Sequence, residues 1–279
     1  MTLEEINKTL NTTYSSFEEF IVNTDWGYLS KYDELSEDFM RCFENYINWS
    51  IVSVYQHMSE DFIREFHDKI DWKNISEYQK LSEEFIREFQ NKVNWGCISE
   101  YQKLSEKFIK EFKDNVEWNF ISMYQKLSED FIREFKDKVE WDWISEFQKL
   151  SEDFIKEFNL EIDNDNWLYK STEFKKQQIV DCGLYECHDD YFIAYKAIRK
   201  DRYSWFNFQY QYLPNETYEA HCDCSKNEIS FGLSVWTKKE ATDYNNKGLI
   251  VKVKVNYEDV GRLVHDSNKI RCNKITILE

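Results

Sequence analysis

The chain has 279 residues, of which 32% are charged, and its formal charge at pH 7 is −17. Residues 1–163 contain 36 Asp and Glu but only 19 Lys and Arg, whereas residues 164–279 contain 17 of each group. All of the excess negative charge therefore lies in the first part of the chain, and this argues against nucleic acid as its partner, because acidic surfaces repel phosphate. The length suits one small domain together with a repeat array.

Three features of the sequence bear on the cellular compartment. The N-terminal residues MTLEEINKTLNTTYSSFEEF are polar and acidic, unlike a signal or transit peptide. No apolar stretch approaches the roughly 20 residues that a membrane-spanning helix needs. The 7 cysteines are an odd number, which favours free thiols in a reducing compartment. We therefore expect a cytoplasmic protein without a membrane partner.

A tryptophan recurs every 23 residues and opens each of six repeats between residues 26 and 163. An aliphatic residue follows three positions later, an aromatic residue six positions later, and phenylalanines follow 13 and 17 positions later. A partial motif, FEEFIVNTDW at residues 17–26, predicts an N-terminal cap over residues 1–25. Fixed periods of this length are typical of stacked units that cannot bury their apolar faces alone. The six tryptophans are Trp26, Trp49, Trp72, Trp95, Trp118 and Trp141.

The apolar spacing within a repeat predicts where helices begin and end. Phe131, Phe135 and Val139 are four residues apart, so we expect them to share one helical face. Trp141 is only two residues past Val139, about 200° further round a helix, so the chain must turn between them. The next helix is expected to carry its apolar residues at spacing three, from Trp141 to Leu150.

A serine at one fixed position of every repeat indicates a second helix start. The serine is followed by Glu and usually by another acid, as is typical of an N-cap and the first turn of a helix. We therefore prefer two short helices per repeat over one kinked helix. The predicted fold of residues 1–163 is an α-solenoid of six 23-residue helical repeats.

The tryptophans and phenylalanines of the repeats are interpreted as a structural ladder in the core. Binding residues of a solenoid are expected instead at variable, exposed positions. The two positions after each tryptophan vary most, and there Phe120 and Trp143 would be exposed aromatic residues. These two are our candidates for contact with a protein partner.

Residues 164–279 are predicted to form a small α+β domain, after a polar linker or end cap at residues 163–167. Strands are expected at 191–200 and 227–236, and a turn at Pro214. Residues 237–248 read as a short helix that begins with a capping box and ends at a glycine. The alternation of LIVKVKVN at 249–256 predicts a strand with one apolar face. In the last strand, KIRCNKITIL, the apolar parity switches, which predicts a bulge near residues 273–274.

Both parts of the chain show a resemblance to viral proteins. The repeats resemble the short Trp/Phe repeats of uncharacterised giant-virus (mimivirus-like) proteins. The segments AYKAIRK, FGLSVWTKKEATDY, LIVKVKV and IRCNKITIL resemble a small domain of unknown function from phage and giant-virus proteins, where it often follows repeat arrays. The resemblance implies the host cytoplasm as location and brings no reaction with it. Ser234 stands where a histidine is more usual, which argues against a histidine-based activity.

Candidate chemistry outside the repeats is sparse. Cys182, Cys187, Cys222 and Cys224 could supply thiolates to zinc, but their spacing is not that of a standard zinc knuckle, so we assign no metal and no cofactor. No nucleophile elbow, triad or glycine-rich phosphate loop is present, so no catalytic residue is assigned.

Two functions are compatible with these features of the sequence. The preferred one is a non-catalytic interaction protein whose acidic solenoid binds a protein partner. The alternative makes the terminal domain an enzyme or a nucleotide-binding module, at best similar to ADP-ribosyltransferases, with Tyr195 and Tyr244 stacking on a nicotinamide. A deep pocket with convergent polar groups near Tyr195 or Asp223 would favour the alternative.

Overall fold

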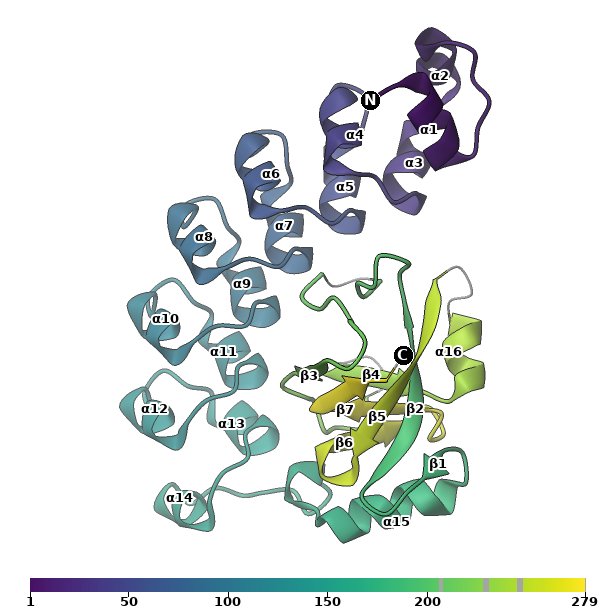
Figure 1. Ribbon diagram of the computed structural model, residues 1–279. Coiled ribbons are helices and arrows are strands. Elements are labelled where there is room, and N and C mark those ends of the chain that lie inside the picture. The colour runs from purple at the N-terminus through teal and green to yellow at the C-terminus, as the bar shows by residue number, and fades with distance from the viewer. Residues whose placement is uncertain (206–207, 228–230, 245–247, 279) are drawn as a thin grey trace. The chain divides into compact units, whose positions relative to one another are not determined.

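The computed structural model describes residues 1–205, 208–227, 231–244 and 248–278 (Figure 1). It divides into two compact units. The first unit holds residues 1–94 together with Phe208, and the second holds residues 95–205 and 209–278. The division falls between the third and fourth repeats, so repeats four to six share a unit with the sheet that follows them. The change from helices to a sheet occurs after residue 163, and a domain boundary at 163/164 stays a prediction.

Each of the six repeats contains two short helices, as predicted. The first unit contains α1 (Leu3–Leu10), α2 (Phe17–Asn23), α3 (Trp26–Tyr32), α4 (Glu37–Cys42), α5 (Trp49–Tyr55), α6 (Glu60–Glu65), α7 (Trp72–Tyr78) and α8 (Glu83–Glu88). In the second unit the repeats provide α9 (Trp95–Tyr101), α10 (Glu106–Glu111), α11 (Trp118–Tyr124), α12 (Glu129–Glu134), α13 (Trp141–Phe147) and α14 (Glu152–Glu157). The Trp-initiated helices stack in order, α3 on α5 and α5 on α7 in the first unit, α9 on α11 and α11 on α13 in the second. The predicted α-solenoid is confirmed.

Serine caps explain where the second helix of each repeat begins. In all six repeats the serine side chain accepts a hydrogen bond from the backbone N–H of the phenylalanine three residues later. These bonds satisfy N–H groups that the first turn leaves without helical partners. Before the tryptophan, Asp25, Asn48 and Asp71 cap in the same way, whereas Glu117 and Glu140 make no side-chain cap.

The helices are shorter than the apolar spacing predicted. Helix α12 ends at Glu134, and Phe135 takes φ −110° and ψ 27° instead of helical angles. A further turn, closed by a bond from the Val139 N–H to the Phe135 carbonyl, keeps Val139 buried without extending the helix. Helix α13 likewise ends at Phe147, so the buried Leu150 lies beyond it. The apolar spacing correctly predicted that these residues are buried, but a turn brings them into the core as well as a longer helix would.

The tryptophan of each repeat packs against the phenylalanines of the same repeat. The centroid of the Trp118 ring lies 5.0 Å from that of Phe135, and that of Trp49 lies 4.8 Å from that of Phe66. The Trp118 Nε1–H donates to the carbonyl of residue 113, five positions earlier, at 2.9 Å. The six tryptophans keep part of their surface exposed, whereas the first phenylalanine of each repeat is buried. The rings thus cover the phenylalanine core from one side.

Within each compact unit, buried glutamines join consecutive repeats. The Gln125 side chain accepts a hydrogen bond from the Leu104 N–H at 3.1 Å and donates to the Ser99 and Gln102 carbonyls at 2.9 and 2.8 Å. Gln56, Gln79 and Gln148 make the equivalent three bonds in their repeats. We call this series the glutamine ladder. It satisfies buried backbone groups that neighbouring helices cannot reach.

Tyr169 ends the ladder after the sixth repeat. Its hydroxyl accepts from the Leu150 N–H and donates to the Gln148 carbonyl, both at 3.1 Å, and so takes the place of the next glutamine. Asn166 adds a bond from its side-chain amide to the Glu146 carbonyl at 2.8 Å. The polar stretch after residue 163 is therefore an end cap of the array.

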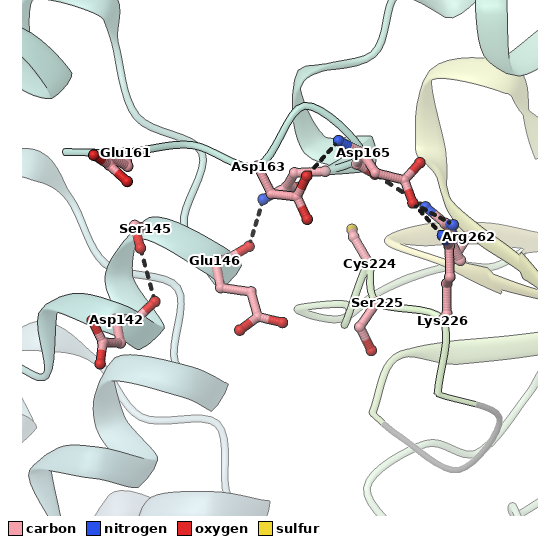
Figure 2. Close-up of a pocket in the computed structure, with 11 residues that line it drawn as sticks. Asp142, Ser145, Glu146, Glu161, Asp163, Asp165, Cys224, Ser225, Lys226 and Arg262 are labelled. Carbon is pink, nitrogen blue, oxygen red and sulfur yellow. Dashed lines mark hydrogen bonds and ion pairs between the residues drawn. The ribbon is translucent and has the colours of Figure 1, made fainter.

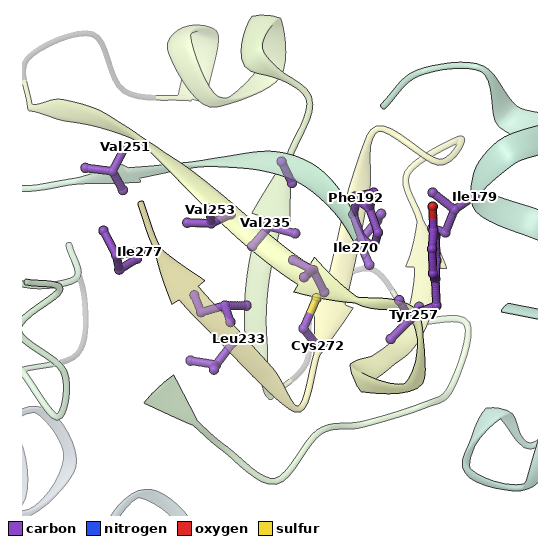
Figure 3. Close-up of a cluster of buried hydrophobic side chains, with 14 of the residues drawn as sticks. Ile179, Phe192, Leu233, Val235, Val251, Val253, Tyr257, Ile270, Cys272 and Ile277 are labelled. Carbon is purple, nitrogen blue, oxygen red and sulfur yellow. The ribbon is translucent and has the colours of Figure 1, made fainter. Parts of the chain in front are cut away.

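The remaining residues form an α+β domain with one curled antiparallel sheet. Its strand order is β3-β8-β5-β2-β4-β7-β6, with β1 paired to β2. Figure 3 shows the buried core, in which Phe192, Val253 and Ile270 are fully buried. The elements are η1 (Trp167–Tyr169), α15 (Thr172–Cys182), β1 (Glu186–Cys187), β2 (Tyr191–Ile198), β3 (Thr217–Glu219), β4 (Leu233–Trp236), α16 (Lys238–Tyr244), β5 (Leu249–Asn256), η2 (Tyr257–Asp259), β6 (Val260–Val264), β7 (Lys269–Cys272) and β8 (Lys274–Ile277).

Most of the predicted elements of this domain are present. The strand at β2, the turn at Pro214, the helix α16 and the alternating strand β5 are confirmed. Parts of the predicted strand at 227–236 and helix at 237–248, namely residues 228–230 and 245–247, lie outside the described residues.

The predicted bulge near residues 273–274 is wrong. The chain there leaves one strand and enters another: β7 pairs with β4 and β6, whereas β8 pairs with β3 and β5. One residue, Asn273, separates them, so the sheet must curl to bring these strands together. The apolar parity switches in the sequence because the chain changes strand partners at this point.

Candidate functional site

The terminal domain lies against α11 and α13 within the second compact unit. The Phe231 ring centroid is 4.5 Å from that of Tyr124 and 5.5 Å from that of Phe147. Gln209 donates from its side-chain amide to the Gln102 side chain at 2.8 Å. One side of repeats four to six is therefore covered by the chain itself.

The two predicted contact aromatics lie next to this covered surface. Phe120, on α11, and Trp143, on α13, are each partly exposed. Their ring centroids are 6.0 Å from Tyr124 and 5.8 Å from Phe147, respectively. They flank the residues that Phe231 contacts, and a role in binding another protein stays a prediction.

A pocket of about 440 Å³ lies between α13, the end cap and the terminal domain (Figure 2). Its walls come from three separate stretches of the chain, within residues 142–146, 161–166 and 224–262. Among the described residues, five carboxylates and two basic side chains line it, which makes it strongly acidic. The lining residues are Asp142, Ser145, Glu146, Glu161, Asp163, Asp165, Asn166, Cys224, Ser225, Lys226 and Arg262.

Both basic side chains of the pocket are bound to one carboxylate. Arg262 Nη2 lies 3.0 Å and Lys226 Nζ 2.9 Å from Asp165 Oδ2. Hydrogen bonds from Arg262 and Lys226 lower the pKa of Asp165 to about 2. Across the pocket, burial raises the pKa of Glu146, and the charges of Asp223 and Asp163 raise it further. The remaining surface of the pocket therefore favours a neutral or cationic ligand over an anion.

The wall formed by Cys224 and Ser225 is anchored by a buried ion pair next to it in the sequence. Arg271, on β7, is fully buried, and its Nη1 lies 2.9 Å from Asp223 Oδ2. The Arg271 Nη2 donates to the carbonyls of Ser225 and Asn227, which holds the following loop as well. Sequence reasoning missed this pair, because the short strand β7 is buried on both faces and its arginine resembles a solvent-facing residue.

The four candidate zinc thiols fall into two pairs. Cys182 ends α15 and Cys187 lies in the exposed strand β1. Cys222 and Cys224 are buried beside the pocket. Among the residues that the structure describes, no three His, Cys, Asp or Glu side chains form a group that could hold a metal ion.

The two tyrosines proposed to stack on a nicotinamide both lie near Trp236. The Tyr244 ring stacks on Trp236 with a centroid distance of 5.2 Å, and Tyr195 is paired with Trp236 across β2 and β4. Neither tyrosine lines the acidic pocket. The structure therefore separates these tyrosines from the polar groups that converge near Asp223.

His221 is buried where the terminal domain contacts α11. Its ring stacks on Phe231 at 5.6 Å, its Nε2 is buried and has no hydrogen-bond partner among the described residues, and burial lowers its pKa to about 4. Because the unfolded chain binds the proton near pH 6.5, the stability that neutral His221 contributes is present above pH 6.5 and is lost as the pH falls towards 4.

We expect the free energy of unfolding of the wild-type protein to fall by about 2 kcal/mol between pH 7 and pH 5, and we expect His221→Gln to abolish this decrease. The measurement is urea denaturation of both proteins at the two pH values. His265→Gln, at an exposed position, is the matched control and should retain the loss. An identical pH response in the wild type and the His221 variant would contradict this assignment.

Comparison with known proteins gave no match to a family model, to a curated protein or to a solved structure. Across the described part of the chain, no helix has both the length and the apolar character that crossing a bilayer requires. The fold and the site together define a helical-repeat protein that carries a small α+β domain.

Proposed function

We propose that the protein is a non-catalytic interaction scaffold whose acidic repeat surface binds a basic segment of a partner protein. In keeping with the resemblance of its repeats and terminal domain to giant-virus proteins, we place it in the cytoplasm of the host of a large DNA virus. The excess of negative charge on the repeats is the observation that carries the proposal.

The second helices of the repeats supply a periodic row of exposed carboxylates. In the first compact unit the row consists of Asp38, Asp61 and Glu84, whose side chains are 84%, 94% and 82% exposed. At Asp38 and Asp61 one arginine stands against three carboxylates: Arg64, for example, lies within 4 Å of Glu60, Asp61 and the next repeat's Glu88. Negative charge therefore remains after these pairs have formed. The Lys and Arg side chains of a basic peptide are complementary in charge to the carboxylates of the row.

The glutamine ladder supports the same proposal, because in the first compact unit it links repeats one to three through buried hydrogen bonds. A fixed spacing between repeats keeps the carboxylates of the row at regular intervals. Binding then costs less ordering of the surface than it would on a flexible acidic chain.

The test is a binding titration of the full chain with a Lys- and Arg-rich peptide. Replacing Asp38 and Asp61 by Asn and Glu84 by Gln should weaken binding about tenfold, since three surface charge pairs contribute roughly 0.5 kcal/mol each. The matched control removes three exposed carboxylates from the terminal domain by Glu173→Gln, Asp189→Asn and Glu216→Gln. Equal weakening by both triple variants would mean that net charge, and not the row, attracts the peptide.

A second candidate function is ligand binding or catalysis by the terminal domain. The acidic pocket beside Asp223 is the observation that favours it. Its five carboxylates disfavour a nucleotide, whose phosphates they would repel, so a neutral or cationic small molecule fits this candidate better than NAD does.

A further inference from the structure

Two buried thiols beside the pocket lie one residue apart in the motif Cys222-Asp223-Cys224. Asp223 is engaged by the buried Arg271 at 2.9 Å. The Cys222 thiol donates to the Asp223 carbonyl at 3.4 Å, and the Cys224 thiol donates to the Cys222 carbonyl at 3.6 Å. The ion pair therefore fixes the residue between the cysteines, and the second bond places the Cys224 sulfur against the backbone of Cys222. None of the seven cysteines is in a disulfide, so both of these thiols are reduced in the structure.

Cys222 is held in a fully buried position by two glycines. A Cβ at Gly232 would lie 2.9 Å from the Cys222 sulfur, and a Cβ at Gly261 would lie closer still. Only residues without a side chain leave room for this sulfur. The neighbouring Cys224 thiol and burial both raise the pKa of the Cys222 thiol, which keeps its proton.

Cys224 has the opposite environment. It is only 5% exposed, but it lines the acidic pocket, as Figure 2 shows, so the molecule that meets its sulfur there must be as small as hydrogen peroxide. The neighbouring Cys222 thiol lowers the pKa of Cys224, and the charges of Lys175 and Arg271 lower it too, against burial and the charge of Asp223, which raise it. Lys175 is itself buried, and its Nζ donates to the Glu258 carbonyl at 3.1 Å, which fixes it in place. Thiols beside fixed cations in partly accessible sites are the reactive ones.

We propose that Cys222 and Cys224 form a redox-active dithiol, in which Cys224 reacts with hydrogen peroxide from the pocket and Cys222 converts the product into an intramolecular disulfide. This site is independent of the acidic row on the repeats.

The chemistry balances with hydrogen peroxide as the only oxidant. The Cys224 thiolate attacks one peroxide oxygen, the O–O bond breaks, hydroxide leaves, and the sulfur becomes a sulfenic acid. The Cys222 sulfur then attacks the Cys224 sulfur, so that an S–S bond forms and the S–O bond breaks. The departing hydroxide takes the Cys222 proton and leaves as water. The two sulfurs lose two electrons in total, and the peroxide gains them.

The test is peroxide treatment of the native full chain, followed by alkylation and peptide mapping. The peptide that contains both Cys222 and Cys224 should lose the mass of two hydrogens, the signature of a disulfide. This should occur about tenfold faster than oxidation of the exposed thiols Cys42 and Cys187, and dithiothreitol should return the peptide to its reduced mass. Oxidation of Cys42 and Cys187 first, with the 222–224 peptide changed only after urea is added, would overturn the proposal.

Variants assign the two roles. In Cys222→Ser a sulfenic acid should accumulate on Cys224 and be trapped by dimedone, whereas Cys224→Ser should give no trapped product at Cys222. Lys175→Met should slow oxidation of Cys224 about tenfold and Lys175→Arg should restore it, because the cation stabilises the thiolate. Near-UV circular dichroism of each variant shows that it is folded. Equal trapping at both cysteines, or no difference between Met and Arg at residue 175, would contradict the assigned roles.

Discussion

Replacement of Asp223 by Asn is expected to lower the free energy of unfolding of the second compact unit by about 3–5 kcal/mol, the range for breaking a buried ion pair. Arg271 is fully buried, and the carboxylate at 2.9 Å is the charge that compensates it. The asparagine keeps the shape of the side chain but leaves the guanidinium charge in a medium that solvates it poorly. The measurement is urea denaturation followed by the far-UV circular dichroism of the sheet.

A matched control and a double variant separate charge from packing. Asp130→Asn removes a carboxylate that is 97% exposed and paired with Arg133, so it should change stability by less than about 1 kcal/mol. The double variant Asp223→Leu with Arg271→Met should be more stable than Asp223→Asn, because it removes both charges. A loss for Asp223→Asn as small as that for Asp130→Asn would show that the pair is not essential.

Replacement of Gln125 by Ala is expected to destabilise the array by roughly 3 kcal/mol. The change leaves one buried N–H, at Leu104, and two buried carbonyls, at Ser99 and Gln102, without the partners they have now. Each unsatisfied buried group costs about 1–3 kcal/mol, partly offset where water can enter. Urea denaturation measures the total loss, and amide hydrogen exchange at Leu104 reports the broken bond directly.

Gln90→Ala is the matched control for this experiment. Gln90 is exposed, and its side-chain amide donates to the Arg87 carbonyl within its own turn. Its replacement should change stability by less than about 0.5 kcal/mol. Unchanged exchange at Leu104 in the Gln125 variant would contradict the role of the glutamine ladder.

The repeat could be predicted from sequence because its strongest features are local. Each serine caps the helix that follows it, and each tryptophan packs on phenylalanines of its own repeat. The glutamine ladder could not be predicted in the same way. Its partners are backbone groups 21 to 26 residues earlier, so a glutamine such as Gln125 reads in the sequence as an ordinary polar residue near a helix end.

The site was harder to predict than the fold for a similar reason. Glu146, Asp165 and Arg262 face one pocket although they are distant in sequence, and nothing in their local spacing indicates it. The parity switch around Asn273 was detected, but its cause, an exchange of strand partners, depends on pairing across the whole sheet. The pair Cys222 and Cys224 was noticed as a metal candidate, whereas its ion-pair anchor through Arg271 was not.

The dependence of peptide binding on salt tests the central claim about the acidic repeat surface most directly. Exposed charges are screened over about 10 Å at 0.1 M salt. The full chain should therefore bind a Lys- and Arg-rich peptide less tightly as sodium chloride is raised from about 0.05 to 0.5 M, and the variant of Asp38, Asp61 and Glu84 should show a shallower dependence. Equal affinity of the wild-type chain at both salt concentrations would contradict recognition by charge, and the exposed aromatics Phe120 and Trp143 would then be the contact residues to test.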